Sequence, residues 1–81
     1  MMSLDLIQSR LNELRERCAY ITYKKLAENE NVDWGEITTV IRMVEGLVED
    51  LGFVENRHSG DKLRLTKKVG EVEEILGKLE G

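Results

Sequence analysis

The sequence predicts a small, mostly helical α+β domain in which a three-helix core carries one β-hairpin and an additional C-terminal helix. Apolar residues recur every three or four positions over residues 4–18, 37–51 and 69–79, as they do on one face of a helix. Residues 62–66 instead alternate charged and apolar side chains, the period of a half-buried strand. With 81 residues, the chain has room for one core, so we expect one domain spanning residues 1–81. Its core would cover about 4–68 and its last helix about 69–80.

The first helix is predicted to begin after Ser3, whose hydroxyl can cap it. Its apolar face consists of Leu4, Ile7, Leu11, Leu14 and Cys18. Tyr20 and Ile21 favour a very short strand. Thr22 can then cap a second, short helix that runs to about Asn29.

Asp33 and Glu36 have the spacing of a capping box, which predicts the start of a third helix. Its apolar stripe consists of Ile37, Val40, Ile41, Val44, Leu47, Val48 and Leu51. Gly52 then occupies a typical C-terminal stop position.

Phe53, Val54 and Glu55 favour a strand, and the segment 56–61 contains Ser59-Gly60-Asp61 as a turn. Lys62–Thr66 would form the return strand of a β-hairpin. The C-terminal helix follows, with an apolar stripe made of Val69, Val72, Ile75, Leu76 and Leu79.

Charge is segregated along the chain, although the formal net charge is only −4. Residues 31–54 carry one basic and five acidic side chains, whereas residues 55–68 carry five basic and two acidic ones. A short segment of this kind attracts anions locally even in an anionic molecule.

Several short pieces follow one another in an order known from one family: Tyr20-Ile21-Thr22, Leu26-Ala27-Glu28, Val32-Asp33, Gly52-Phe53-Val54-Glu55 and Leu63-Arg64-Leu65-Thr66-Lys67-Lys68. Over about residues 4–69 the chain resembles the winged helix-turn-helix family of small prokaryotic and archaeal DNA-binding regulators. The resemblance implies a winged helix-turn-helix fold, binding to double-stranded DNA and a role in transcription regulation. The third helix departs from the family pattern, because it is acidic and about one helical turn longer than usual.

The resemblance also implies which residues touch DNA. The third helix would present Thr38, Thr39 and Arg42 to base edges. The hairpin would act as a wing along the phosphates. The predicted backbone contacts are Arg57, His58, Lys62, Arg64, Lys67 and Lys68 from the wing, with Lys24 and Lys25 from the second helix.

Two alternatives stay open. The basic side chains of the hairpin also fit solvated charges that protect an edge strand from aggregation. In addition, the acidic third helix suits a protein partner better than a phosphate-lined groove, so a protein-interaction module without direct DNA binding is the alternative function.

The first and last helices have apolar stripes that one small core does not obviously cover. We therefore expect a homodimer, as is common among the regulators that the chain resembles. The predicted interface consists of Leu4, Ile7, Leu11, Leu14, Val72, Ile75 and Leu79. The alternative is that both helices wrap the core of the monomer.

The sequence predicts no catalytic, metal or cofactor site. One cysteine and one histidine cannot form a zinc cluster, and His58 lies far along the chain from Cys18, so no nucleophile and base pair is evident. Cys18 is expected to be a buried small apolar residue. No apolar run approaches the ~20 residues that span a membrane, and we expect a cytoplasmic protein.

Overall fold

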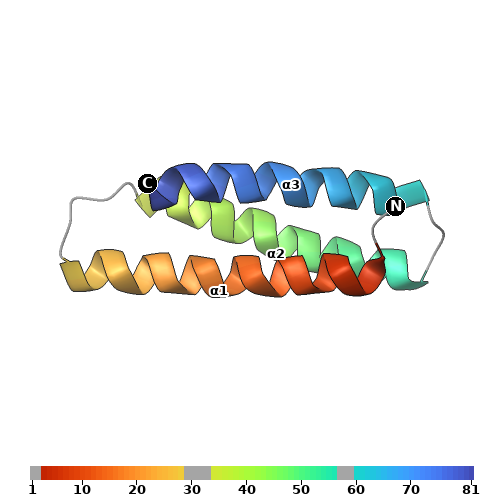
Figure 1. Ribbon diagram of the computed structural model, residues 1–81, viewed down its shortest axis with the longest axis horizontal. Helices are drawn as coiled ribbons and strands as arrows, with labels where there is room; N and C mark the ends of the chain where they lie inside the picture. Colours follow the sequence, from red (N-terminus) through yellow and green to blue (C-terminus); the bar gives the residue numbers. More distant parts are fainter. Residues whose placement is uncertain (1–2, 29–33, 57–59) are drawn as a thin grey trace.

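Three long helices make up the computed structural model, which describes residues 3–28, 34–56 and 60–81. Helix α1 spans Leu4–Glu28, α2 spans Trp34–Asn56 and α3 spans Gly60–Glu80. Of the described residues, all but Ser3 and Gly81 are helical. The chain runs up, down and up, so α2 is antiparallel to α1 and α3 (Figure 1). The result is an elongated bundle of 45 × 17 × 15 Å.

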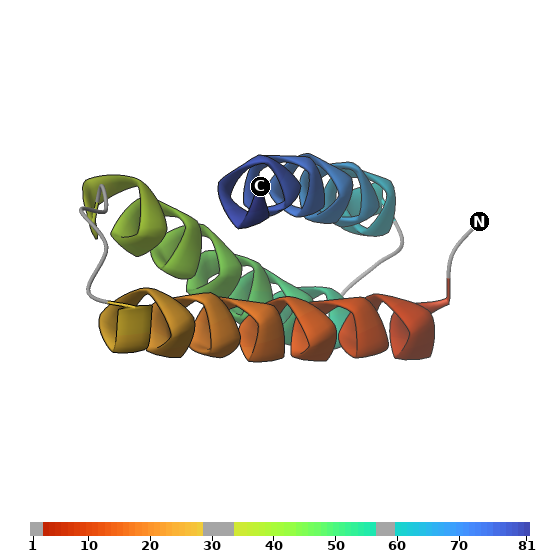
Figure 2. The same ribbon diagram turned by 60° about the vertical axis from the view of Figure 1, so that its left-hand side comes forward.

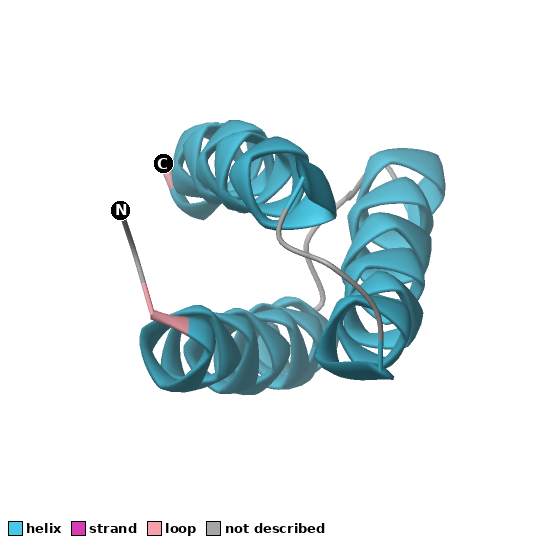
Figure 3. Ribbon diagram, turned by 90° about the vertical axis from the view of Figure 1, so that its right-hand side faces the viewer, coloured by secondary structure: helices cyan, strands magenta, loops and turns pink. Residues whose placement is uncertain are grey.

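Each helix carries the alternating three- and four-residue spacing of a heptad repeat, which keeps one apolar seam facing its neighbours. The seam residues of α1 are Leu4, Ile7, Leu11, Leu14, Cys18 and Ile21, those of α2 are Ile37, Val40, Val44, Leu47, Leu51 and Val54, and those of α3 are Leu65, Val69, Val72, Leu76 and Leu79. Leu4 and Leu79 are partly buried against this core, and all the others are buried. Seen end on, the three helices stand at the corners of a triangle around that seam (Figure 3).

The predicted β-hairpin, and with it the α+β winged helix-turn-helix fold, is wrong. The described residues contain no strand: Phe53–Glu55 belong to the last turns of α2, and Lys62–Thr66 belong to the first turns of α3. Leu65 lies four residues before Val69 and continues its buried stripe. Leu63, which a strand would place on the same face as Leu65, is 64% exposed. Residues 57–59 of the predicted turn lie outside the described residues.

The predicted break within the first helix is also wrong, because α1 continues through Tyr20, Ile21 and Thr22 to Glu28. Ile21 follows Cys18 by three residues and is buried with it. The Thr22 hydroxyl donates a hydrogen bond to the carbonyl oxygen of Cys18 at 2.8 Å, so it bonds back into its own helix and caps nothing. The predicted cap at Ser3 is confirmed, since the Leu6 N–H donates to Ser3 Oγ at 3.2 Å.

Two further helix boundaries differ from the prediction. Helix α2 does not stop at Gly52 but continues to Asn56, because Val54 extends its buried seam by one more turn. The C-terminal helix begins at Gly60 and not near Val69, for the reason given for Leu65. Asp33 of the predicted capping box lies outside the described residues.

Candidate functional site

An open groove lies between the first turns of α2 and the last turns of α3. Figure 2 shows the start of α2 standing apart from the end of α3 at this end of the bundle. The groove has a volume of about 600 Å³ and is lined mainly by apolar atoms. Its lining consists of Gly35, Glu36, Thr39, Val40 and Met43 from α2, with Ile75, Lys78 and Leu79 from α3.

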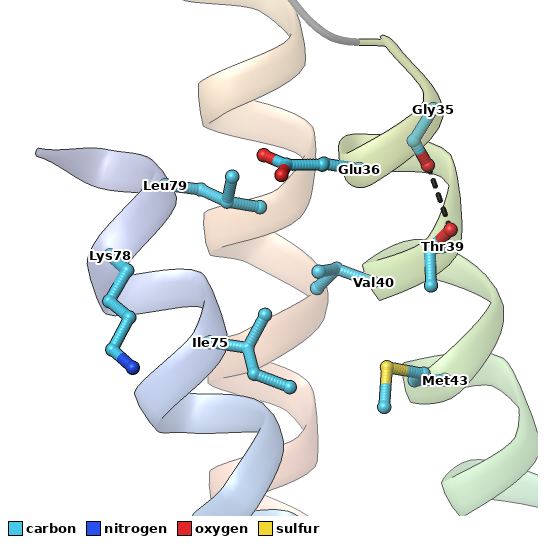
Figure 4. A pocket seen from close by; sticks show the side chains of 8 residues that line it. All are labelled: Gly35, Glu36, Thr39, Val40, Met43, Ile75, Lys78 and Leu79. Carbon is cyan, nitrogen blue, oxygen red and sulfur yellow. Dashed lines mark hydrogen bonds between the residues drawn. The ribbon is translucent and has the colours of Figure 1, made fainter.

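Four apolar side chains form the centre of the groove. Val40 and Leu79 belong to the core seam, whereas Met43 and Ile75 lie further out and are 39% and 37% exposed. In Figure 4 these side chains point into the space between the two helices, and the ribbon of α1 passes behind them. The groove is therefore an extension of the core that the chain's own described residues leave open to solvent.

The two walls of the groove carry opposite charge. Glu36 stands on the α2 wall, and in Figure 4 its carboxylate extends toward α3, while Lys78 stands on the α3 wall. Gly35 adds no side chain to the α2 wall, and the Thr39 hydroxyl donates to the Gly35 carbonyl oxygen at 2.8 Å. A hydroxyl bonded in this way is not an unsatisfied donor at the groove.

The heptad spacing extends both walls along the bundle. Asp50 follows Met43 by seven residues and Lys68 precedes Ile75 by seven, so each lies on the same stripe two helical turns away. Because α2 and α3 are antiparallel, both steps lead toward the same end of the bundle. The α2 stripe is thus acidic, apolar and acidic at Glu36, Met43 and Asp50. The α3 stripe is basic at Lys68 and Lys78, and Ile75 and the acidic Glu71 lie between them.

The predicted base-contacting residues Thr38, Thr39 and Arg42 are all exposed on the first turns of α2. Thr39 borders the groove. The structure therefore leaves these side chains accessible, but it places them on a surface helix of a bundle and not on the recognition helix of a winged domain.

The predicted wing cations lie on a helix, not on a hairpin. Lys62, Arg64, Lys67 and Lys68 fall in the first two to three turns of α3. Lys62 is in the first turn, where the helix macrodipole disfavours positive charge. No carboxylate among the described residues forms an ion pair with any of the four. Arg57 and His58 lie outside the described residues.

Lys24 and Lys25 do not join this cluster. They occupy the last turns of α1, at the opposite end of the bundle from the start of α3 (Figure 1). Lys24 pairs with Glu28 at 3.9 Å, an i,i+4 contact within α1. The structure therefore separates the predicted backbone contacts into two groups instead of one continuous basic surface.

The predicted dimer interface is largely the core of the monomer. Ile7, Leu11, Leu14 and Val72 are buried among the chain's own helices, so these four residues are not available to a second copy. This outcome matches the alternative in which the first and last helices wrap the core. Of the remaining three, Leu4 and Leu79 are partly buried and Ile75 is exposed in the groove.

On the side away from the groove, α1 and α3 are joined by two ion pairs. The Arg10 Nε–H donates to Glu73 Oε2 at 2.9 Å and the Arg17 Nε–H donates to Glu80 Oε2 at 3.1 Å, and in each pair Nη2 donates to the second carboxylate oxygen. These hydrogen bonds lower the pKa of Glu73 and of Glu80 below the ordinary carboxyl value. The pairs thus cover the α1–α3 seam, whereas no ion pair crosses the α2–α3 seam among the described residues.

The described residues show no evident catalytic or metal centre. They hold no group of three or more potential metal ligands. Burial raises the pKa of the Cys18 thiol, which disfavours the nucleophilic thiolate. No helix among the described residues is long and apolar enough to cross a membrane.

Comparison of the chain with protein-family models, with curated proteins and with solved structures finds no match to any of them. Among the described residues, the α2–α3 groove and the charged stripes beside it are the features that indicate a function. Sequence periodicity contained a signal for them, because Glu36, Met43 and Asp50 are spaced by seven residues. That signal is visible only once the segment is placed on one continuous helix.

Proposed function

We propose that this protein is a protein-interaction module that docks a helical surface of a protein partner on its α2–α3 face. The observation that carries the proposal is the groove, where Met43 and Ile75 continue the core outward and stay accessible. An open apolar groove between two helices is the usual receptor for the apolar face of a further helix.

The charges around the groove support a protein partner. Helix α2 carries Glu36, Glu45, Glu49, Asp50 and Glu55 against the single base Arg42. Such a helix repels phosphates but attracts basic side chains. A cytoplasmic location, expected from the sequence, is part of the proposal.

Site-specific photo-crosslinking tests this function. A photoreactive amino acid replaces Met43 in the full chain, and a matched variant carries it in place of Tyr23, which is exposed on the outer side of α1. In cells that make the protein, we expect a discrete protein adduct from position 43 and none from position 23. Equal labelling from both positions, or no protein adduct from position 43, contradicts the proposal.

Duplex DNA is a second candidate partner, favoured by one observation: Lys62, Arg64, Lys67 and Lys68 lack ion-pair partners among the described residues. If these side chains neutralise phosphates, log affinity falls with log salt by about 0.9 per phosphate contact. Replacing Arg64, Lys67 and Lys68 by alanine would then reduce that slope, while the control Arg15→Ala on α1 would not. Undetectable DNA binding at low salt rejects this candidate.

A further inference from the structure

We infer that the partner docked on the α2–α3 face is a second copy of this chain, related by a two-fold axis parallel to the helices. This inference rests on the proposed function, and it names the occupant of the groove. A symmetric dimer requires a surface that is complementary to itself. The two stripes that flank the α2–α3 seam meet this requirement.

The complementarity lies in the order of the side chains along each stripe. The α2 stripe carries Glu36, Met43 and Asp50, and the α3 stripe carries Lys78, Ile75 and Lys68 in the same direction along the bundle. Asp50 and Lys68 each lie seven residues from Met43 and Ile75, so acid stands level with base at this end, and an apolar residue stands level with an apolar residue in the middle. At the other end Glu36 lies seven residues from Met43 whereas Lys78 lies three from Ile75, so the two stand about one helical turn apart, a span that the long side chain of Lys78 can cover.

A two-fold axis parallel to the seam places the α2 stripe of each copy opposite the α3 stripe of the other copy. Each residue keeps its position along the long axis of the bundle. Asp50 then faces Lys68 of the other copy, and Glu36 lies about one helical turn from Lys78 of the other copy, within reach of its side chain. Met43 meets the other copy's Ile75 in the same way. Each of these contacts occurs twice, and the two apolar grooves close on each other.

A copy related by an axis perpendicular to the helices would place α2 on α2 and α3 on α3, so that acid faces acid and base faces base. The parallel axis is thus the arrangement that brings the acidic α2 stripe opposite the lysines of the α3 stripe. Outside the two stripes, the outermost positions carry charges of both signs, namely Arg42 and Glu49 on α2 and Lys67 and Glu74 on α3. These charges therefore do not favour a different arrangement of the two copies.

The size of the face and its steric properties also fit a second copy. The whole bundle measures 45 × 17 × 15 Å, so the outline of one long side is on the order of the ~800 Å² that each partner buries in a stable complex. Gly35, Thr39 and Gly46 lie on the outer side of α2, and a Cβ added at Gly46 would meet no atom within 4 Å. Small side chains at these positions let a facing helix approach closely.

Charge reversal in two complementary variants tests the inference by sedimentation equilibrium. The first variant, Glu36→Lys with Asp50→Lys, makes both stripes basic, and the second, Lys68→Glu with Lys78→Glu, makes both acidic. For each variant alone we expect the dimer dissociation constant to rise at least about tenfold, because four attractive pairs become repulsive. An equimolar mixture should form the heterodimer with near wild-type affinity, since each basic stripe then faces an acidic one.

Rescue in the mixture is a result that loss of folding cannot produce, and circular dichroism of each variant checks the fold independently. The control Arg15→Glu, on the exposed side of α1, should leave the dimer unchanged. Variants that associate as well as the wild type, or a mixture that stays monomeric, overturn the inference.

Failure of the inference and failure of the proposed function are distinguishable. A chain that stays monomeric, yet crosslinks from position 43 to a different protein, overturns the second copy and keeps the interaction module. A monomeric chain that gives no protein adduct from position 43, but binds DNA through Arg64, Lys67 and Lys68, overturns both.

Discussion

Arg10 on α1 holds the carboxylate of Glu73 on α3 with two hydrogen bonds, across a separation of 63 residues in the chain. Arg17 and Glu80 repeat the contact at the same separation, one heptad further along. Equal separations mean that α1 and α3 keep one register over this heptad. The pairs flank the apolar seam as charged residues do in parallel coiled coils, where they select the pairing of the helices.

These ion pairs predict a specific dependence of stability on pH. Because the pKa values of Glu73 and Glu80 are lower in the folded chain than in the unfolded chain, the pairs stabilise the fold fully above the unfolded carboxyl value of about 4.3. That contribution is lost as the pH falls through the lowered folded values. For two solvent-accessible pairs we expect a loss of about 1 kcal/mol in the free energy of unfolding.

Urea unfolding followed by far-UV circular dichroism measures this effect in the wild type and in the variant Glu73→Gln with Glu80→Gln. We expect the variant to be less stable near neutral pH and to approach the wild type in acid. Glu16→Gln, which changes an exposed carboxylate on α1, is the control. Identical pH profiles for wild type and the double variant would show that the pairs contribute nothing.

The substitution Gly52→Ala should stabilise the chain. Gly52 lies within α2, four residues before its end, and a Cβ built there meets no atom within 4 Å. The methyl group thus causes no clash, while it restricts the unfolded chain and favours the helix by about 1 kcal/mol. The reverse change at an exposed position of α1, Ala19→Gly, should destabilise by a similar amount in the same thermal unfolding assay. A lower melting temperature for Gly52→Ala would contradict a continuous α2.

Truncation of Leu14 should destabilise the fold far more than truncation of Leu6. Leu14 is fully buried in the three-helix core, so Leu14→Ala should cost about 2–5 kcal/mol of unfolding free energy. Leu6 is on the same helix but 50% exposed, and Leu6→Ala should change stability by less than about 0.5 kcal/mol. Trp34, the single tryptophan, reports unfolding by fluorescence. Equal effects at both positions would be incompatible with the observed packing of α1.

Cys18 should react with thiol reagents only when the bundle opens. Its side chain is buried in the core, and burial raises the pKa of its thiol, which keeps the thiolate scarce. We expect alkylation in the native chain to be slower by orders of magnitude than in urea, because reaction then follows the population of the unfolded state. Native labelling as fast as that of a free thiol peptide would mean that α1 is not packed as described.

Local periodicity predicted the cores of all three helices but not their ends. The spacing of Leu4 to Cys18, of Ile37 to Leu51 and of Val69 to Leu79 agrees with the helices observed. The errors concern segments where strand propensity or a glycine competed with that spacing, as at Tyr20-Ile21, at Gly52 and at Lys62–Thr66. In each segment the next seam residue, Ile21, Val54 or Leu65, gains burial only if the helix continues.

The candidate site was less accessible to prediction. Alternation in Lys62–Thr66 suggested a wing, so Lys68 and Lys78 were assigned to different elements and Ile75 and Leu79 to a dimer interface made with other helices. Once both fall on α3, opposite the Glu36, Met43 and Asp50 stripe of α2, one face contains them all.

The sequence alone determined the helical faces, because the positions of apolar side chains in the chain fix which side of a helix seeks burial. The tertiary structure decided which of those faces are covered and which charges meet, since that depends on contacts between residues far apart in the chain. Leu14 is buried in the core, whereas Met43 stays exposed at the groove. Arg10 finds its partner on α3, whereas Lys68 has no ion-pair partner among the described residues.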